Sequence, residues 1–225
     1  MTAPNPELLR SLGKLARGLS ALFWGLPTAL LVCAETARAD WLKPLGILPP
    51  LAVNALLLFG LVQMGGFQRQ ERPWRAALDR AKLLALVDLG LCPFLYWHNK
   101  MPGEFFFTAV VLLLALSGLL FLFNLNLVLK RLGAMLPDET LRLETTQFTA
   151  MNRWLLALLL LLAVAYVGFS QLSQPPPSLG IFLFWIGRAS KWLLIFFALL
   201  PLAMTMALIW KTKEVIYDSV FGPRQ

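Results

Sequence analysis

Residues Phe105–Leu129 read FFFTAVVLLLALSGLLFLFNLNLVL and contain no charged side chain. As an α-helix rising about 1.5 Å per residue, this stretch is long enough to cross a hydrocarbon core of about 30 Å. Lys130 and Arg131 follow it directly, whereas the preceding loop, residues 98–104, holds one cation and one anion. Because positive charge stays on the cytoplasmic side of membrane proteins, we predict a transmembrane helix whose Leu129 end is cytoplasmic.

The composition of the whole chain also indicates a membrane protein. Of its 225 residues, 58% are hydrophobic and 14% are charged, and the mean hydropathy is +0.69, which is too apolar for an ordinary soluble domain. The formal net charge of +8 comes from cations that flank apolar segments, so it indicates orientation in a membrane rather than nucleic-acid binding. Anionic lipids on the cytoplasmic side are the expected partners of these cations.

We predict an all-α polytopic membrane protein with six transmembrane helices in three hairpins and both termini in the cytoplasm. The predicted spans cover residues 19–34, 45–64, 83–97, 105–129, 155–173 and 192–210. A cytoplasmic amphipathic segment, residues 1–18, precedes them, and a cytoplasmic tail, residues 211–225, follows them. Most of the 20 Lys and Arg then lie on the inner side. A five-span alternative, in which 83–97 only dips into the bilayer, puts residues 130–154 outside and weakens this bias.

Three inner segments carry apolar and polar faces at helical spacing, at residues 6–18, 73–82 and 137–154. The first is predicted to lie along the cytoplasmic interface. Each begins at a proline and leads into an outward-going helix, which suggests three parallel hairpin units. The alternative is that any hairpin-built membrane protein obeying the positive-inside rule has this pattern.

The third predicted span, residues 83–97, is short, because a helix of this length covers only about 22 Å. It must begin nearer Ala76, thin the bilayer locally or be sheltered by its neighbours. Pro93 is expected to kink it, because proline removes a helical hydrogen bond.

The segment 137–154 is predicted to start a helix at Pro137 or Asp138 that continues directly into the fifth span. Phe148 and Met151 share its apolar face. We expect residues 181–190 to lie at the outer interface, before the last span.

Asp88 is the only acidic residue within a predicted span. An ionised carboxylate there costs several kcal/mol unless it is paired, hydrated or protonated. Counted from the inner ends of their spans, Asn124 and Asn126 reach the same depth, so the three residues could line an ion or proton path. The alternative is interhelical hydrogen bonding that fixes helix register, at about 0.6 kcal/mol per bond. Because Asn124 and Asn126 are two positions apart, both cannot face Asp88 equally.

Arg188 and Lys191 could form an anion or lipid contact at the outer rim, because residues three apart share a helix face. The alternative is that both side chains snorkel to the head groups. Cys33 and Cys92 are predicted to be free thiols, with a disulfide as the alternative if their helices adjoin. No HExxH, GxSxG, P-loop or GxGxxG motif occurs, so we predict no catalytic residue, no metal site, no cofactor and no enzyme activity.

Two classes of function remain. The preferred hypothesis is a non-catalytic integral-membrane subunit or scaffold of a larger assembly, in contact with other membrane subunits or with itself and located in a bacterial inner membrane. The alternative is a small homo-oligomeric ion channel or transporter with Asp88 on the cytoplasmic side of its path. The middles of the predicted spans contain few polar residues, whereas transporter sites combine broken helices with several convergent polar groups, which favours the first hypothesis.

Overall fold

The computed structural model describes residues 6–39, 42–68, 70–136, 139–170 and 199–217. In chain order its elements are α1 (Pro6–Arg38), the 3-10 helix η1 (Lys43–Leu45), α2 (Leu48–Met64), α3 (Arg72–Leu91), α4 (Pro93–Lys100), α5 (Phe105–Met135) and α6 (Glu139–Ser170). A further helix covers residues 199–217. The prediction of an all-α fold is therefore confirmed for the described part of the chain.

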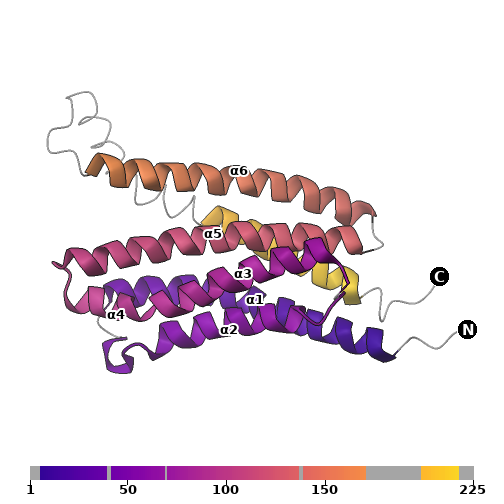
Figure 1. Ribbon diagram of the computed structural model, residues 1–225, viewed down its shortest axis with the longest axis horizontal. Coiled ribbons are helices and arrows are strands. Elements are labelled where there is room, and N and C mark those ends of the chain that lie inside the picture. The colour runs from indigo at the N-terminus through magenta and orange to yellow at the C-terminus, as the bar shows by residue number, and fades with distance from the viewer. Residues whose placement is uncertain (1–5, 40–41, 69, 137–138, 171–198, 218–225) are drawn as a thin grey trace, which may run out of the picture.

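The long helices lie lengthwise beside one another in an elongated bundle (Figure 1). We call one end basal: it holds the first residues of α1, α3 and α6 and the last residues of α2, α5 and the helix 199–217. The other, distal end holds the last residues of α1 and α4 and the first residues of α2 and α5. α1 packs along α2, α3 along α5, and α5 along α6.

Two of the described helices are long and apolar enough to cross a membrane, namely Arg10–Arg38 of α1 and the whole of α5. The apolar helix α2 is shorter. α5 begins at Phe105, as the sequence predicts, and continues beyond the predicted end at Leu129 to Met135. The described chain is thus a helical protein with two candidate membrane-spanning helices.

α1 unites two segments that the sequence analysis separated at residue 18. The expected interfacial segment is the first part of one uninterrupted helix. Leu15 and Leu19 are completely buried, and a Cβ on Gly18 would lie 2.6 Å from the carbonyl oxygen of Gly60 in α2. The apolar face of the segment therefore packs against α2, which removes it from water as a membrane surface would.

The short predicted span 83–97 belongs to a longer helical run that begins at Arg72. This is the first of its three predicted solutions. The run is interrupted at Pro93, where α4 begins. Proline has no N–H to donate to the carbonyl oxygen of Leu89, and the thiol of Cys92 donates to that oxygen instead, at 3.2 Å.

α6 confirms that the helix before the fifth predicted span continues directly into it. Phe148 and Met151, which the sequence places on one apolar face, are both exposed, whereas Thr149 and Asn152 are buried. The polar face is turned toward α5 and the helix 199–217, where Asn152 finds hydrogen-bond partners. This arrangement leaves the apolar face of α6 on the outside of the bundle.

The last predicted span, residues 192–210, is only partly described. From residue 199 the helix continues to residue 217, into the predicted tail. The predicted interfacial segment 181–190 lies outside the described residues.

The largest buried side chains gather toward the basal end. They include Leu15, Leu19, Met64, Trp74, Leu78, Leu129 and Leu132. Trp74 anchors the α2–α3 connection, because its indole Nε1 donates to the carbonyl oxygen of Phe67 at 3.1 Å and the two rings meet edge to face. This contact holds the start of α3 against the end of α2.

Candidate functional site

Asp88 lies on α3 toward the distal half of the bundle, and its side chain is well buried, with 5% of the residue exposed. Ser117 of α5 is similarly buried and lies within electrostatic reach of the carboxylate. Among the described residues, neither the Oδ1 atom of Asp88 nor the Oγ atom of Ser117 has a hydrogen-bond partner. Two polar atoms with unused bonding capacity are thus buried between α3 and α5.

Three further polar side chains surround this pair. Cys33 of α1 and Cys92, which follows α3, both interact electrostatically with Asp88. The Nδ2 atom of Asn54 in α2 lies 3.7 Å from the sulfur of Cys33 and donates to the carbonyl oxygen of Pro50 at 2.8 Å. Both cysteines are free thiols. We call Cys33, Asn54, Asp88, Cys92 and Ser117 the Asp88 cluster.

The structure places Asn126 in another part of the bundle from Asp88. Its Nδ2 atom donates to the carbonyl oxygen of Leu122 at 2.8 Å and to Oγ1 of Thr205 at 2.9 Å, and its Oδ1 accepts from Asn152 at 3.0 Å. Asn124 donates to the carbonyl oxygen of Leu120 on its own helix, at 2.9 Å.

The separation follows from where α3 begins. The predicted depth of Asp88 was counted from a helix start at residue 83, but α3 starts at Arg72. Asp88 is therefore near the distal end of α3, at the level of Ser117, and about 13 Å along α5 separates Ser117 from Asn126.

Asn126, Asn152 and Thr205 form a second buried cluster, the Asn126 cluster, which joins α5, α6 and the helix 199–217. All three residues are completely buried. Asn152 Nδ2 also donates to Thr205 Oγ1 at 3.0 Å and to the carbonyl oxygen of Pro201 at 3.2 Å, and Thr205 donates to the same carbonyl at 2.8 Å. The Oδ1 atom of Asn152 has no hydrogen-bond partner among the described residues, but the other bonds join three helices, so the cluster is well suited to fix their register.

The sequence analysis missed Asn152 and Thr205. Asn152 lies within the amphipathic segment 137–154, and Thr205 is a single hydroxyl in an apolar run. A sequence signal exists for Asn152: Thr145 and Thr149 precede it by seven and three residues, so the three polar side chains lie on one face of the helix.

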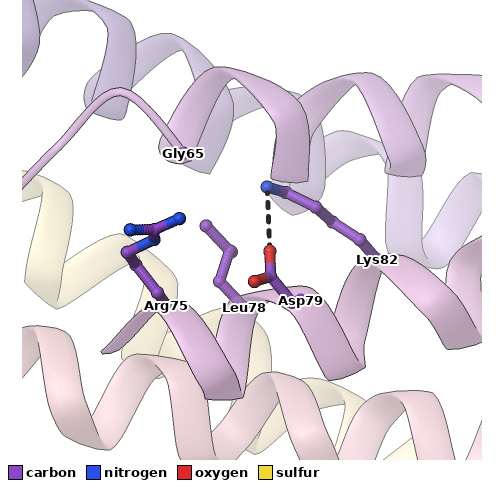
Figure 2. A pocket seen from close by; sticks show the side chains of 5 residues that line it. All are labelled: Gly65, Arg75, Leu78, Asp79 and Lys82. Carbon is purple, nitrogen blue, oxygen red and sulfur yellow. Dashed lines mark ion pairs between the residues drawn. The ribbon is translucent and has the colours of Figure 1, made fainter. Parts of the chain in front are cut away.

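A hollow of about 450 Å³ opens near the basal end, lined by Gly65, Arg75, Leu78, Asp79 and Lys82. Figure 2 shows the side chains of α3 reaching toward Gly65, with Lys82 paired to Asp79 at 3.6 Å. A second hollow, of about 340 Å³, shares Gly65 and Lys82 with it and is further lined by Lys14, Val62, Gln63 and Gly66. Three cations from α1 and α3 therefore converge on the end of α2.

Arg188 and Lys191 lie outside the described residues, so their predicted lipid or anion contact stays a prediction. Among the described residues, no three His, Cys, Asp or Glu side chains gather as a metal site would require. The class defined by the fold is a helical protein with two candidate membrane-spanning helices. Comparisons with protein-family models, with curated proteins and with solved structures each give no match to this chain.

Proposed function

We propose that the chain is a polytopic protein of a bacterial inner membrane, with six spans in three hairpins and both termini in the cytoplasm. Large apolar side chains on the outer surfaces of several helices support this proposal; examples are Trp24, Phe59, Leu83, Leu113 and Leu161. Large exposed apolar patches are rare on soluble monomers, so exposed apolar side chains on five helices favour a surface that faces lipid. In this arrangement lipid chains cover it, and the basal end faces the cytoplasm.

Cysteine labelling tests this topology. A thiol reagent that does not cross membranes is expected to label Lys100→Cys, in the distal connection, from outside intact cells. Arg131→Cys, which is exposed near the basal end, is expected to react only after the membrane is opened. Labelling of both variants from outside would overturn the proposed orientation.

Within this membrane we propose the role of a non-catalytic subunit or scaffold that associates through α6. The observation that carries the proposal is an exposed apolar stripe on α6, which includes Leu143 at 74% and Trp154 at 79% exposure, together with Met151, Leu158 and Leu161. These residues recur at intervals of about one or two helical turns, as in helix–helix interfaces. With the span at residues 155–173, Leu143 and Met151 lie beyond the hydrocarbon, where lipid chains do not cover them.

Site-specific photocrosslinking in intact membranes tests the association. A photoreactive residue at Leu143 or Met151 is expected to capture protein, either a second copy or another membrane subunit. The matched control is Leu83 of α3, which is similarly exposed but lies at lipid depth and should capture mainly lipid. Protein capture that is absent at Leu143, or equal at Leu83, would overturn association through α6.

A small ion channel or transporter is the second candidate, and one observation favours it. Asp88 and Ser117 are buried with unused polar atoms, and such groups in membrane spans often mark ion or proton paths. Proteoliposome flux of protons and monovalent cations separates the two functions. Flux that is present in the native chain and abolished in Asp88→Asn would support the channel, whereas equal baseline leak in both proteins would count against it.

A further inference from the structure

The two hollows near the basal end, which together we call the basal hollow, have a strongly positive lining. Lys14 comes from α1, and Arg75 and Lys82 come from α3, while Asp79 is the one acidic residue among the described residues that line the two hollows. The cations therefore outnumber the anion, although the hollow is part of a folded three-helix junction and not of a loose tail. An excess of converging cations favours an anionic ligand.

The backbone opposite these cations leaves room for a ligand. Gly65 and Gly66 follow α2 directly, and a Cβ added at Gly65 would lie 3.0 Å from the Nζ atom of Lys82. Any larger residue there would fill the space beside the ammonium group. The start of α3 is also held against the residues that follow α2, since Trp74 donates to the carbonyl oxygen of Phe67 at 3.1 Å. The hollow is thus preformed.

The ion pair within the hollow leaves its cations available. Lys82 meets Asp79 at 3.6 Å, and the carboxylate side chain is 66% exposed. A pair so open to solvent contributes little free energy, so an incoming anion can compete for Lys82. Figure 2 shows Arg75 and Lys82 on either side of Leu78, with their charged groups on the same side of α3. An arginine guanidinium offers two parallel N–H donors to an oxyanion, and lysine adds a compact charge.

We propose that the basal hollow binds a phosphate group, carried either by the head group of an anionic phospholipid or by a soluble phosphate ester. Phosphate matches the donors present, because Arg75 can donate to two of its oxygens while Lys14 and Lys82 contact the others. The lipid source rests on the proposed membrane topology, which brings the basal hollow to the level of the inner head groups. The soluble source does not depend on that topology.

Binding to the purified full-length chain in neutral detergent tests the proposal. Native mass spectrometry would count adducts of phosphatidylglycerol against those of phosphatidylcholine, and titration calorimetry would measure glycerol phosphate and inorganic phosphate. The test protein carries Lys14→Gln, Arg75→Gln and Lys82→Gln together. Its matched control neutralises three exposed basal cations outside the hollow, through Arg80→Gln, Arg131→Gln and Arg142→Gln.

The triple variant is expected to lose phosphatidylglycerol or phosphate affinity by about 100-fold, because each lost charge-assisted contact contributes at least several-fold. The control is expected to change by less than about threefold at physiological salt, where distant charges are screened. Selective loss of the lipid adducts assigns the site to a head group, and selective loss of glycerol phosphate or phosphate binding assigns it to a soluble ester. Equal losses in test and control proteins, or no binding in either arm, would overturn the proposal.

A gain-of-binding variant removes the concern that the triple variant is misfolded. Asp79→Asn deletes the competing carboxylate of the hollow and is expected to strengthen phosphate binding by about fivefold. Glu214→Gln makes the same charge change at an exposed position outside the hollow and is expected to leave binding within about twofold. If both variants strengthen phosphate binding equally, the binding depends on the net charge of the protein and not on the basal hollow, and the proposed site is overturned. The labelling of Arg131→Cys independently reports whether the membrane topology has failed.

Discussion

The basal and distal ends of the bundle are packed very differently, although largely the same helices form both. At the basal end Leu15, Trp74 and Leu132 are at most 1% exposed, whereas at the distal end of α5 Phe105 is 75% exposed. α1 and α5 have 33 and 31 residues, so each is between about 46 and 50 Å long and exceeds a hydrocarbon core of about 30 Å. In the proposed topology the excess length projects into water at the basal end.

This difference indicates which interactions stabilise the bundle in water and which stabilise it in the proposed hydrocarbon region. In water, burial of apolar surface drives packing, and the basal end accordingly has a dense core of large side chains. In hydrocarbon that drive is absent, so helices associate through small residues and interhelical hydrogen bonds. The Asn126 cluster, at the basal edge of the proposed hydrocarbon region, provides interhelical hydrogen bonds among three helices. The two ends should therefore respond differently to the same kind of substitution.

The largest expected effect is that of Trp74→Ala. It removes a buried indole and its bond to the carbonyl oxygen of Phe67, and should lower the free energy of unfolding by between about 3 and 5 kcal/mol. Phe105→Ala also removes an aromatic ring, but an exposed one, and should change stability by less than about 0.5 kcal/mol. Unfolding in mixed micelles with increasing SDS, followed by circular dichroism, measures both. Equal losses would abolish the distinction between the two ends.

The close approach of α1 and α2 predicts a smaller loss. In Gly18→Ala the new Cβ would lie 2.6 Å from the Gly60 carbonyl oxygen, so the helices must separate, at about 1 to 3 kcal/mol. Gly13→Ala lies in the same helix with nothing within 4 Å of its Cβ, and should be neutral or stabilise by up to about 1 kcal/mol. The same unfolding assay applies. A stabilised Gly18→Ala protein would contradict the tight basal packing of α1 on α2.

The sequence predicted much of the fold, because hydrophobic runs and proline positions determine helices locally. The start of α5 at Phe105, the interruption at Pro93 and the continuity of α6 all follow from such local patterns. The expected trio of Asp88, Asn124 and Asn126 did not assemble. The level of Asp88 along the bundle depends on where α3 begins. The first residues of α3 are polar, so they did not look like part of the apolar span from which that level was counted.

The face that α6 buries was also beyond local reasoning. The sequence predicted that Phe148 and Met151 share an apolar face but not which face is buried; α6 buries Thr149 and Asn152 and exposes Phe148 and Met151. That choice is made by partners elsewhere in the chain, since Asn152 bonds to Asn126 and Thr205. The sequence pattern shows that α6 has a polar and an apolar face, and hydrogen bonds to other helices determine that the polar face is buried.

The smallest predicted effect concerns the polar contacts that join three helices at the edge of the basal core, where Asn126 lies between the buried Leu125 and Leu129. Asn126→Leu removes the bonds to Thr205 and Asn152 and should lower the free energy of unfolding by between about 0.6 and 1.7 kcal/mol, the range of interhelical hydrogen bonds in membranes. Asn124→Leu removes only a bond to its own helix, to the carbonyl oxygen of Leu120, and should be nearly neutral. In the SDS assay, the difference between these two neighbours isolates interhelical bonding, since both exchanges remove the same group from α5. If Asn124→Leu destabilises as much as Asn126→Leu, the Asn126 cluster does not hold α6 and the helix 199–217 to α5, and apolar packing must act throughout the bundle.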